Sequence, residues 1–317
     1  MNIWQELPRP FFVMAPLEGV ADTVFRQIIA SIAKPDLFVT EFTSADGLCS
    51  RGKDIVSQNV RFSLSEQPII VQLWGKNPET MYEAAYAVSR MGFSGIDINM
   101  GCPDRAVMRS GCGAAMIDTP DSVKEVIDAV KKGSNGLPVS VKTRLGNKRI
   151  IDSWIPFLLE QDVDALTIHG RTVAELSKVP AHWDEIGKVV EMRNRFKCNT
   201  VIIGNGDVKD REEALDKAKT YGVDGVMIGR GVFQNLWAFD PNGHSASPRE
   251  LLDIMVLHIK LFDTTWGNQK NYASIKKFYK MYMNGFHDAT SWRERFMATN
   301  TPQEALGLAK ELRTCLS

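Results

Sequence analysis

Two glycine-rich turns late in the sequence have the composition of a phosphate-binding site. Gly204–Asp207 reads Gly-Asn-Gly-Asp and Gly229–Gly231 reads Gly-Arg-Gly, and each follows a short apolar run. Glycine lets backbone N–H groups approach a phosphate closely, and a following helix adds the positive end of its dipole. Arg230 would add a charge-assisted hydrogen bond. Each turn alone indicates only a tight loop, but both together with Lys142 and His169 predict a bound phosphate.

Lys142 and His169 stand at the ends of two further β-rich runs. Lys142 has three interpretations: a Schiff-base lysine, a partner for an electron-rich ring, or half of a structural ion pair. His169 could be a base, a hydrogen-bond donor to a cofactor, or a buried structural histidine. A lone histidine is usually structural, but a strand-end position facing Lys142 favours a functional role.

Cys102 lies in a Gly-Cys-Pro turn directly after a predicted strand. An ordinary thiol, with a pKa of about 8.5, is mostly protonated at neutral pH and can act as a general acid or as a nucleophile. A thiol that acts as a nucleophile needs a neighbouring base or stabilising cations, whereas a thiol that acts as an acid needs only to lie close to the atom that it protonates. Cys112 is the competing thiol, but its small-residue turn, Gly111–Ala115, is typical of close packing. The five cysteines form no Cys-x-x-Cys pair, so we expect reduced thiols and no metal.

Eight β-rich runs alternate with helical patterns, which predicts an α/β fold, a (β/α)8 TIM barrel. Active-site groups of such barrels lie at the carboxyl ends of the strands, where the polar residues above fall. A doubly wound sheet is the alternative, but its first turn should carry a glycine-rich dinucleotide motif, which Ala15–Gly19 is not. The predicted strands are Phe11–Met14, Leu37–Thr40, Ile69–Leu73, Ile96–Asn99, Val139–Lys142, Ala165–Ile168, Val201–Gly204 and Gly225–Ile228.

Helix signals lie between these runs. Thr119 is a predicted N-cap for a helix over Pro120–Lys132. Amphipathic patterns predict helices at Glu79–Met91 and at Asp210–Tyr221, the latter ended by Gly222.

The composition changes near residue 240, where Asp240–Pro248 is typical of a linker. Strand signals vanish beyond it. We therefore predict a catalytic barrel over residues 1–240 and a small C-terminal all-helical domain over residues 248–317. Its predicted helices are Pro248–Trp266, Asn271–Gly285 and Pro302 to the end.

The formal charge of the 317 residues is zero, from 38 Lys+Arg and 38 Asp+Glu. No apolar run reaches the roughly 18 residues of a membrane span, and the start lacks the pattern of a secretory signal. We expect a cytoplasmic monomer without a membrane. A net charge of zero does not exclude a nucleic-acid partner, because residues 1–247 carry a net charge of −3 and residues 248–317 a net charge of +3.

The basic residues of the tail cluster between Lys270 and Arg295, where six Lys/Arg stand against two acids. The lysines are hard to bury and favour a partner surface, whereas aromatics at this spacing are more often the core of a helical bundle. The interleaved aromatics are Tyr272, Phe278, Tyr279, Tyr282, Phe286 and Trp292.

Six motifs follow one another along the chain: Met14–Val20, Asp97–Pro103, Val141–Arg144, His169–Thr172, Gly204–Asp207 and Gly229–Gly231. Together they resemble the flavin-dependent tRNA-dihydrouridine synthases. They follow the family's order, and the Asn-x-Gly-Cys-Pro turn combined with His-Gly-Arg-Thr is the specific part. At Ala106 and Ser274–Tyr279 the sequence is loosely closest to the bacterial C-type subgroup.

The resemblance implies FMN at the barrel mouth, NADPH as reductant, and hydride transfer to C6 of a uracil in tRNA. Cys102 stands at the family's proton-donor position and would protonate C5. Asn99 and Arg171 would contact the target nucleotide, and Lys276 and Lys277 the RNA. The positions implied for FMN are Pro16, Leu17, Glu18, Gln72, Lys142 and His169 around the ring and ribityl chain, and Asn205, Gly206, Asp207, Gly229 and Arg230 around the phosphate.

Three other functions fit parts of the pattern. An FMN barrel oxidoreductase of the dihydropyrimidine or dihydroorotate dehydrogenase type would act on a free pyrimidine and need no basic tail. A phosphate-sugar lyase or aldolase would use Lys142 as a Schiff base. An RNA-binding barrel without catalysis would have no use for Cys102.

Overall fold

The computed structural model describes residues 2–316. Nine parallel strands among these residues form one sheet in the order β2-β1-β9-β8-β7-β6-β5-β4-β3, and pairing of β2 with β4 closes it. Eight strands make a closed barrel, and β3 is a two-residue addition beside the carboxyl end of β4. The predicted (β/α)8 barrel is confirmed. The strands are β1 Phe11–Met14, β2 Leu37–Val39, β3 Thr43–Ser44, β4 Ile69–Trp74, β5 Gly95–Met100, β6 Val139–Gly146, β7 Ala165–Thr172, β8 Val201–Asn205 and β9 Gly225–Ile228.

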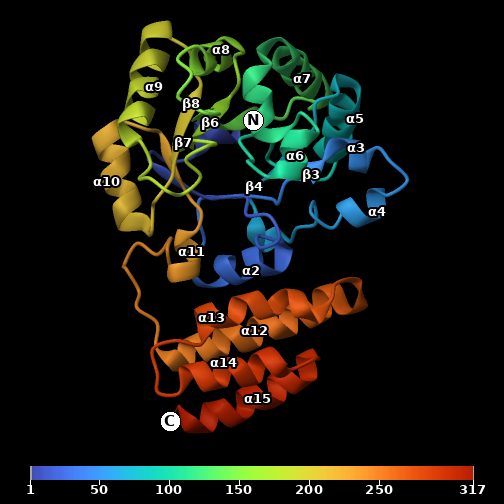
Figure 1. Ribbon diagram of the computed structural model, residues 1–317, viewed down its shortest axis with the longest axis vertical. Coiled ribbons are helices and arrows are strands. Elements are labelled where there is room, and N and C mark those ends of the chain that lie inside the picture. The colour runs from blue at the N-terminus through green and yellow to red at the C-terminus, as the bar shows by residue number, and fades with distance from the viewer. Residues whose placement is uncertain (1, 317) are drawn as a thin grey trace.

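Helices surround the barrel, and the C-terminal helices pack against one side of it (Figure 1). No helix in the described range is long and apolar enough to cross a membrane. The barrel helices are α1 Ile3–Glu6, α2 Thr23–Ile32, α3 Ala45–Leu48, α4 Lys53–Val56, η1 Leu64–Glu66, α5 Pro78–Ser89, α6 Arg105–Arg109, η2 Gly113–Asp118, α7 Pro120–Gly133, α8 Trp154–Glu160, α9 Trp183–Phe196, α10 Arg211–Tyr221 and α11 Gly231–Gln234. The C-terminal helices are α12 Pro248–Trp266, η3 Gly267–Gln269, η4 Tyr272–Phe278, α13 Tyr279–Tyr282, α14 Ala289–Ala298 and α15 Pro302–Cys315.

The predicted barrel helices correspond to α5, α7 and α10. Asp210 accepts a hydrogen bond from Glu213 N, and Gly222 ends α10 in the left-handed region at φ 69°. Thr119 occupies the predicted N-cap position before Pro120, but its side chain caps no N–H of α7. Its hydroxyl instead donates to Met116 O.

Alternate residues of the strands face the barrel interior, because the side chains of a strand alternate between its two faces. The interior is apolar along β8, β9, β1 and β2, where Phe11, Val13 and Ile203 belong to one buried cluster. It is polar along β4, β5 and β6, where Asp97 pairs in register with Gln72 on one side and Ser140 on the other. The other face of the strands packs on the helices in a separate apolar core.

The C-terminal helices pack on α2. The Phe25 ring of α2 stacks on Phe278 with centroids 5.1 Å apart, and His258 of α12 lies beside Phe278 at 4.8 Å. Asp22, the N-cap of α2, accepts hydrogen bonds from Trp266 Nε1 and Lys270 Nζ, each at 3.0 Å. Apolar packing and a shared N-cap therefore join the two parts of the molecule.

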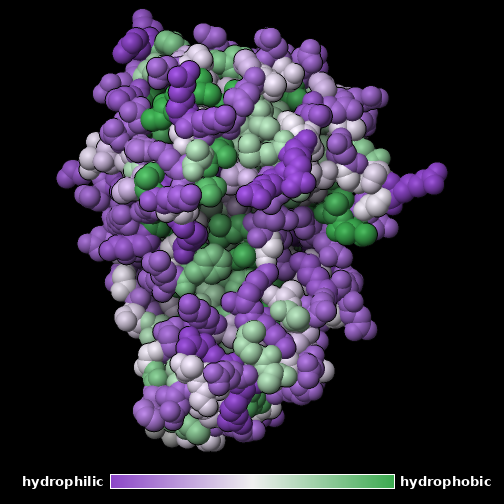
Figure 2. All heavy atoms as spheres, viewed as in Figure 1, coloured by the Kyte–Doolittle hydropathy of each residue, from purple (hydrophilic) through white to green (hydrophobic). Residues whose placement is uncertain are grey.

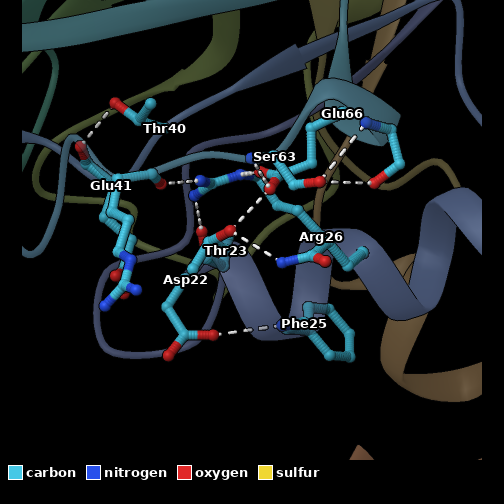
Figure 3. Close-up of polar contacts among 12 residues, drawn as sticks. Asp22, Thr23, Phe25, Arg26, Thr40, Glu41, Ser63 and Glu66 are labelled. Atoms are coloured by element: carbon cyan, nitrogen blue, oxygen red, sulfur yellow. Dashed lines mark hydrogen bonds and ion pairs between the residues drawn. The ribbon is translucent and has the colours of Figure 1, made fainter. Parts of the chain in front are cut away.

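A buried ion pair fixes α2 to the barrel (Figure 3). The Arg26 guanidinium pairs with Glu66, and both side chains are fully buried. Glu66 also accepts from Thr23 Oγ1 at 2.5 Å and from Ser63 N at 2.7 Å. Because every charge here has a partner, α2 is a rigid support for the helices that pack on it.

The predicted helix at Asn271–Gly285 is helical over Tyr272–Tyr282, but it is a 3-10 helix, η4, followed by the single α-helical turn α13, and it ends before Gly285. Phe278, Tyr279 and Tyr282 are buried. The same burial confirms that these three aromatic residues are core. Helix α14 was missed, since it starts at Asp288 without a side-chain cap and buries only Phe296.

Candidate active site

A cavity of about 600 Å³ opens at the carboxyl ends of the strands. Loops after β1, β2, β5, β6, β7, β8 and β9 supply its walls. Figure 2 shows the surface hollowed between the barrel and the C-terminal helices, with hydrophobic residues at the centre of the hollow. The predicted site residues that line the cavity are Pro16, Leu17, Asn99, Cys102, Lys142, His169, Arg171, Asn205, Gly206, Asp207, Gly229 and Arg230.

Cys102 is held in its turn by two side chains. Asn99 Oδ1 accepts from Gly101 N at 3.2 Å and from Cys102 N at 3.0 Å. Arg144 Nε donates to Gly101 O at 2.8 Å. Burial raises the pKa of the Cys102 thiol, and this outweighs the attraction of Arg144 for a thiolate. The thiol is therefore protonated at neutral pH, which favours an acid over a nucleophile.

Lys142 projects into the cavity from β6. Its Nζ lies 3.3 Å from Asn205 Oδ1, and no described carboxylate forms a salt bridge with it. Burial, helped by Arg144, lowers the lysine pKa to about 8. The structural ion pair is therefore the weakest of its three interpretations.

His169 is a neutral imidazole in this site. Burial is the largest cause and the neighbouring cations, Lys142 first, add to it, so the histidine pKa falls to about 2. The ring can exchange hydrogen bonds with a cofactor, but it cannot hold a second proton near neutral pH. Arg171 Nη1 lies 3.5 Å from His169 Nε2.

The two glycine-rich turns meet on one wall and form a cradle. Gly206 has φ +128°, and a Cβ there would lie 2.7 Å from Ala181 Cβ and 3.2 Å from the His169 ring. Asp207 follows in the left-handed region and pairs with both Arg171 and Arg230, the latter at 3.4 Å. At position 206 only glycine allows this backbone conformation so close to Ala181 and His169.

The charge of the cavity wall is strongly positive. The carboxylate of Asp207 is the only acid on the wall, within the described residues, against five cations. Such a wall binds an anion with charge-assisted hydrogen bonds, as a phosphate requires. The cations are Lys142, Arg144, Arg171, Lys209 and Arg230.

Four predicted site residues do not line the cavity. Gln72 is fully buried beneath it, bonded to Asp97 and Asn99. Glu18 is exposed near the mouth, yet the protein atoms around it and then Glu41 raise its carboxyl pKa to about 7. The remaining two are Lys276, whose Nζ donates to Met297 O at 2.8 Å, and Lys277, whose Nζ contacts Gly19 O.

The cavity also has wall residues that the sequence did not assign. Arg144 is one of them, although it lies within a recognised motif, and Lys209 follows the cradle by two residues. Phe42 could have been found as the aromatic residue just beyond the second strand. Ser177 and Gln234 carry no sequence signal, since loop folding alone brings them to the wall.

The geometry defines the class first: a (β/α)8 barrel with an anion cradle after its last two strands and a protonated thiol across the same cavity. A model of the dihydrouridine synthase family matches residues 13–316. The chain belongs to this family, whose members are FMN-dependent oxidoreductases.

Named relatives agree over nearly the whole length. A probable tRNA-dihydrouridine synthase of Staphylococcus aureus (strain COL) is 43% identical over 314 residues, which cover 98% of this chain and 95% of the relative. A probable tRNA-dihydrouridine synthase 2 of Bacillus subtilis (strain 168) is 42% identical over 311 residues, 97% of this chain and 95% of the relative. The solved structure of morphinone reductase shares the fold, with a TM-score of 0.55 at 14% identity over 78% of this chain and 90% of that one.

Proposed function

We propose that this protein reduces the C5–C6 bond of uridines in tRNA to give 5,6-dihydrouridine, with NADPH as reductant. The observation that carries the proposal is a protonated thiol, Cys102, on the same cavity as a cationic phosphate cradle. A reduction of this bond needs a hydride at C6 and a proton at C5. When bound, FMN supplies the hydride that it has received from NADPH.

The residues present fit FMN. The phosphate belongs in the cradle of Asn205, Gly206, Asp207, Gly229 and Arg230, where a Cβ on Gly206 would clash and cations face the cavity. The flavin ring and ribityl chain belong along the wall of Pro16, Leu17, Lys142 and His169, with contacts also assigned to Glu18 and Gln72. The cationic Lys142 favours the negative charge of a reduced flavin, and the neutral His169 offers a hydrogen bond.

Cys102 donates the proton to C5 of the uracil. Its turn is fixed by Asn99 and Arg144, so the thiol keeps one position in the cavity. Asn99 also lines the cavity and can contact the uracil with the amide N–H that Gln72 does not accept. Arg171, beside the cradle, is also assigned to the target nucleotide.

A uracil in folded RNA must leave its stack before it can enter such a cavity. The barrel, residues 1–240, would hold the base, and the helices of residues 248–317 would hold the phosphates of the tRNA. Lys276 and Lys277 are the proposed RNA contacts, and Lys277 already reaches the loop at Gly19 beside the mouth. An enzyme with this substrate would work in the cytoplasm, and we assign it as a monomer.

The direct test supplies purified protein with NADPH and one of two kinds of substrate. The first is tRNA from a strain that lacks dihydrouridine, and the second is a free pyrimidine: uridine, uracil or orotate. We expect yellow protein that releases FMN, and dihydrouridine formation in tRNA alone. Reduction of the free pyrimidines at an equal rate would support a free-base enzyme instead. A colourless protein that borohydride traps on a sugar phosphate through Lys142 would support the aldolase.

A further inference from the structure

A chain of buried hydrogen bonds runs beneath the cavity from β6 to the Cys102 turn. Asp97 Oδ1 accepts from Ser140 Oγ at 2.6 Å, and Asp97 Oδ2 accepts from Gln72 Nε2 at 2.7 Å. Gln72 Oε1 accepts from Asn99 Nδ2 at 2.9 Å. Asn99 Oδ1 then accepts from the N–H of Cys102.

This chain has one direction, which the Asp97 carboxylate favours at one end and the N–H groups of Gly101 and Cys102 favour at the other. A carboxylate can only accept hydrogen bonds, so Gln72 must turn its NH2 group toward Asp97. Its oxygen then faces Asn99, whose NH2 group must turn toward Gln72. The Asn99 oxygen is thereby left for the backbone of Gly101 and Cys102. A reversed Asn99 would set its NH2 group against two N–H donors.

The chain of hydrogen bonds lies in the buried interior of the barrel, where hydrogen bonds fix the orientation of side chains strongly. Gln72 and Ser140 are fully buried, Asp97 is 4% exposed and Asn99 is 6% exposed. No described arginine or lysine forms a salt bridge with Asp97, so its direct partners are the hydrogen-bond donors Ser140 and Gln72, while the charge of Lys142 acts on it from a greater distance. Buried hydrogen bonds in a dry interior fix side-chain orientation more firmly than exposed ones.

We propose that Asp97 is a positioning residue for Cys102, acting through Gln72 and Asn99 to orient the turn that carries the thiol. This inference rests on the proposed role of Cys102 as the proton donor. Asp97 does not line the cavity, so we assign it no contact with substrate or cofactor. Its effect is therefore expected only in the half-reaction that uses the thiol.

The first measurement separates the two half-reactions of the flavin-loaded enzyme. Asp97→Asn can present either an oxygen or an NH2 group to Gln72, so the direction of the chain is lost. We expect flavin reduction by NADPH to change little, while reoxidation of the reduced enzyme by tRNA slows about tenfold or more with an unchanged KM for tRNA. The matched control is Ser140→Ala, which removes the other hydrogen bond of the same carboxylate and should leave both rates within about twofold.

A rescue variant tests direction rather than mere packing. In Asp97→Asn with Gln72→Glu the carboxylate moves to position 72, accepts from both neighbours and again forces the Asn99 NH2 group toward position 72. We expect it to recover most of the lost rate per bound flavin. If Asp97→Asn slows both half-reactions equally, or if the double variant is as slow as the single one, the proposal is overturned.

A readout without turnover separates this proposal from the proposed function. Iodoacetamide labelling of Cys102 is followed by mass spectrometry, with the exposed Cys49 and Cys315 as internal references. We expect Asp97→Asn to change the labelling rate of Cys102 about threefold or more, because its turn is less well held. Unchanged labelling would overturn the positioning role. Absence of any reaction of the wild-type enzyme with tRNA, with labelling altered as expected, would contradict the proposed function alone.

Discussion

The two halves of the barrel interior differ in polarity and in the residues that their strands present to the cavity. The half formed by β8, β9, β1 and β2 is apolar below Asn205, which ends β8, and the turns after β8 and β9 present glycines together with Asp207 and Arg230 to the cavity. The half formed by β4 to β7 carries polar side chains inside the barrel and ends in the residues assigned to the chemistry. These polar side chains are Gln72, Asp97, Asn99, Ser140, Lys142, Thr167 and His169.

The difference teaches how one fold combines stability with a reactive site. An apolar interior gains free energy from burial and needs no hydrogen-bond partners, and the phosphate site that we propose lies at the strand ends of that half. A polar interior is tolerated only if its groups find hydrogen bonds. Gln72, Asp97 and Asn99 find them in one another, and the same bonds that satisfy them also orient the Cys102 turn.

The largest effect is expected at the polar half. Cys102→Ala should lower uridine reduction about 10²- to 10⁴-fold, the contribution of a positioned general acid, while flavin content and reduction by NADPH persist. Stopped-flow flavin reoxidation with tRNA measures it. Cys112→Ala is the control, because its thiol lies outside the cavity wall. A rate of Cys102→Ala equal to that of the control would remove Cys102 from its role.

The next effect is expected in the apolar half, on stability. Phe11 is fully buried inside the barrel. Phe11→Ala should lower the free energy of unfolding by about 3–5 kcal/mol, because a large cavity opens in a packed interior. Urea unfolding of the flavin-free protein measures it.

The control for Phe11 is an exposed apolar residue. Ile55 is 75% exposed on α4, so Ile55→Ala should change the free energy of unfolding by less than about 0.5 kcal/mol. Similar losses in the two variants would contradict the assignment of stability to the apolar interior.

A smaller effect is expected in the cradle. Arg230→Ala removes one charge-assisted contact to the phosphate, so the affinity for FMN should fall about tenfold. Flavin titration into the flavin-free protein measures the Kd. Arg249→Ala, an exposed arginine at the start of α12, is the charge-matched control and should bind FMN like the wild type. Equal affinity in both variants would exclude Arg230 from the cradle.

The smallest effect is the pH dependence of stability at Asp97. Burial raises the pKa of this carboxyl to about 6, above its value in the unfolded chain. The native state therefore binds the proton more tightly, and the stability present at low pH is lost as pH rises through about 6.

Asp97→Asn removes this titration. The stability of the variant relative to the wild type should therefore increase by about 1 kcal/mol between pH 5 and pH 7.5. Urea unfolding at the two pH values measures it. A difference that does not change with pH, or one that decreases, would show that Asp97 is not held in a desolvating interior.

Much of the fold could be predicted because apolar runs and helix-capping residues are local features of the sequence. All eight barrel strands were apolar enough to be recognised. Helix α12 begins and ends at the predicted residues, Pro248 and Trp266, and a capping box of Ser247 and Glu250 marks its start. The segment after it was predicted as one α-helix but is mostly a 3-10 helix, in which Phe278 packs on α2 and α12, Tyr282 on α12 and Tyr279 on Phe296 of α14.

The candidate site was predictable to the extent that its residues follow strands directly. Cys102, Lys142, His169 and the two glycine turns could be placed on one rim, because parallel strands of a barrel all end on the same side. The same reasoning does not give the depth or the contacts of a side chain. Gln72 lies beneath the cavity, bonded to Asp97, and the Nζ of Lys277 contacts Gly19 O.

The sequence by itself determined the barrel, the order of its strands and the residue types at their ends, because strand polarity and glycine turns are local properties. Only the tertiary structure decided the protonation of the site and the direction of its hydrogen bonds. The pKa values of Cys102, Lys142 and His169 depend first on burial and then on nearby charges, among them Arg144 in all three cases. The link from Asp97 to Cys102 exists only because the register of β4, β5 and β6 places Gln72, Asp97 and Ser140 side by side.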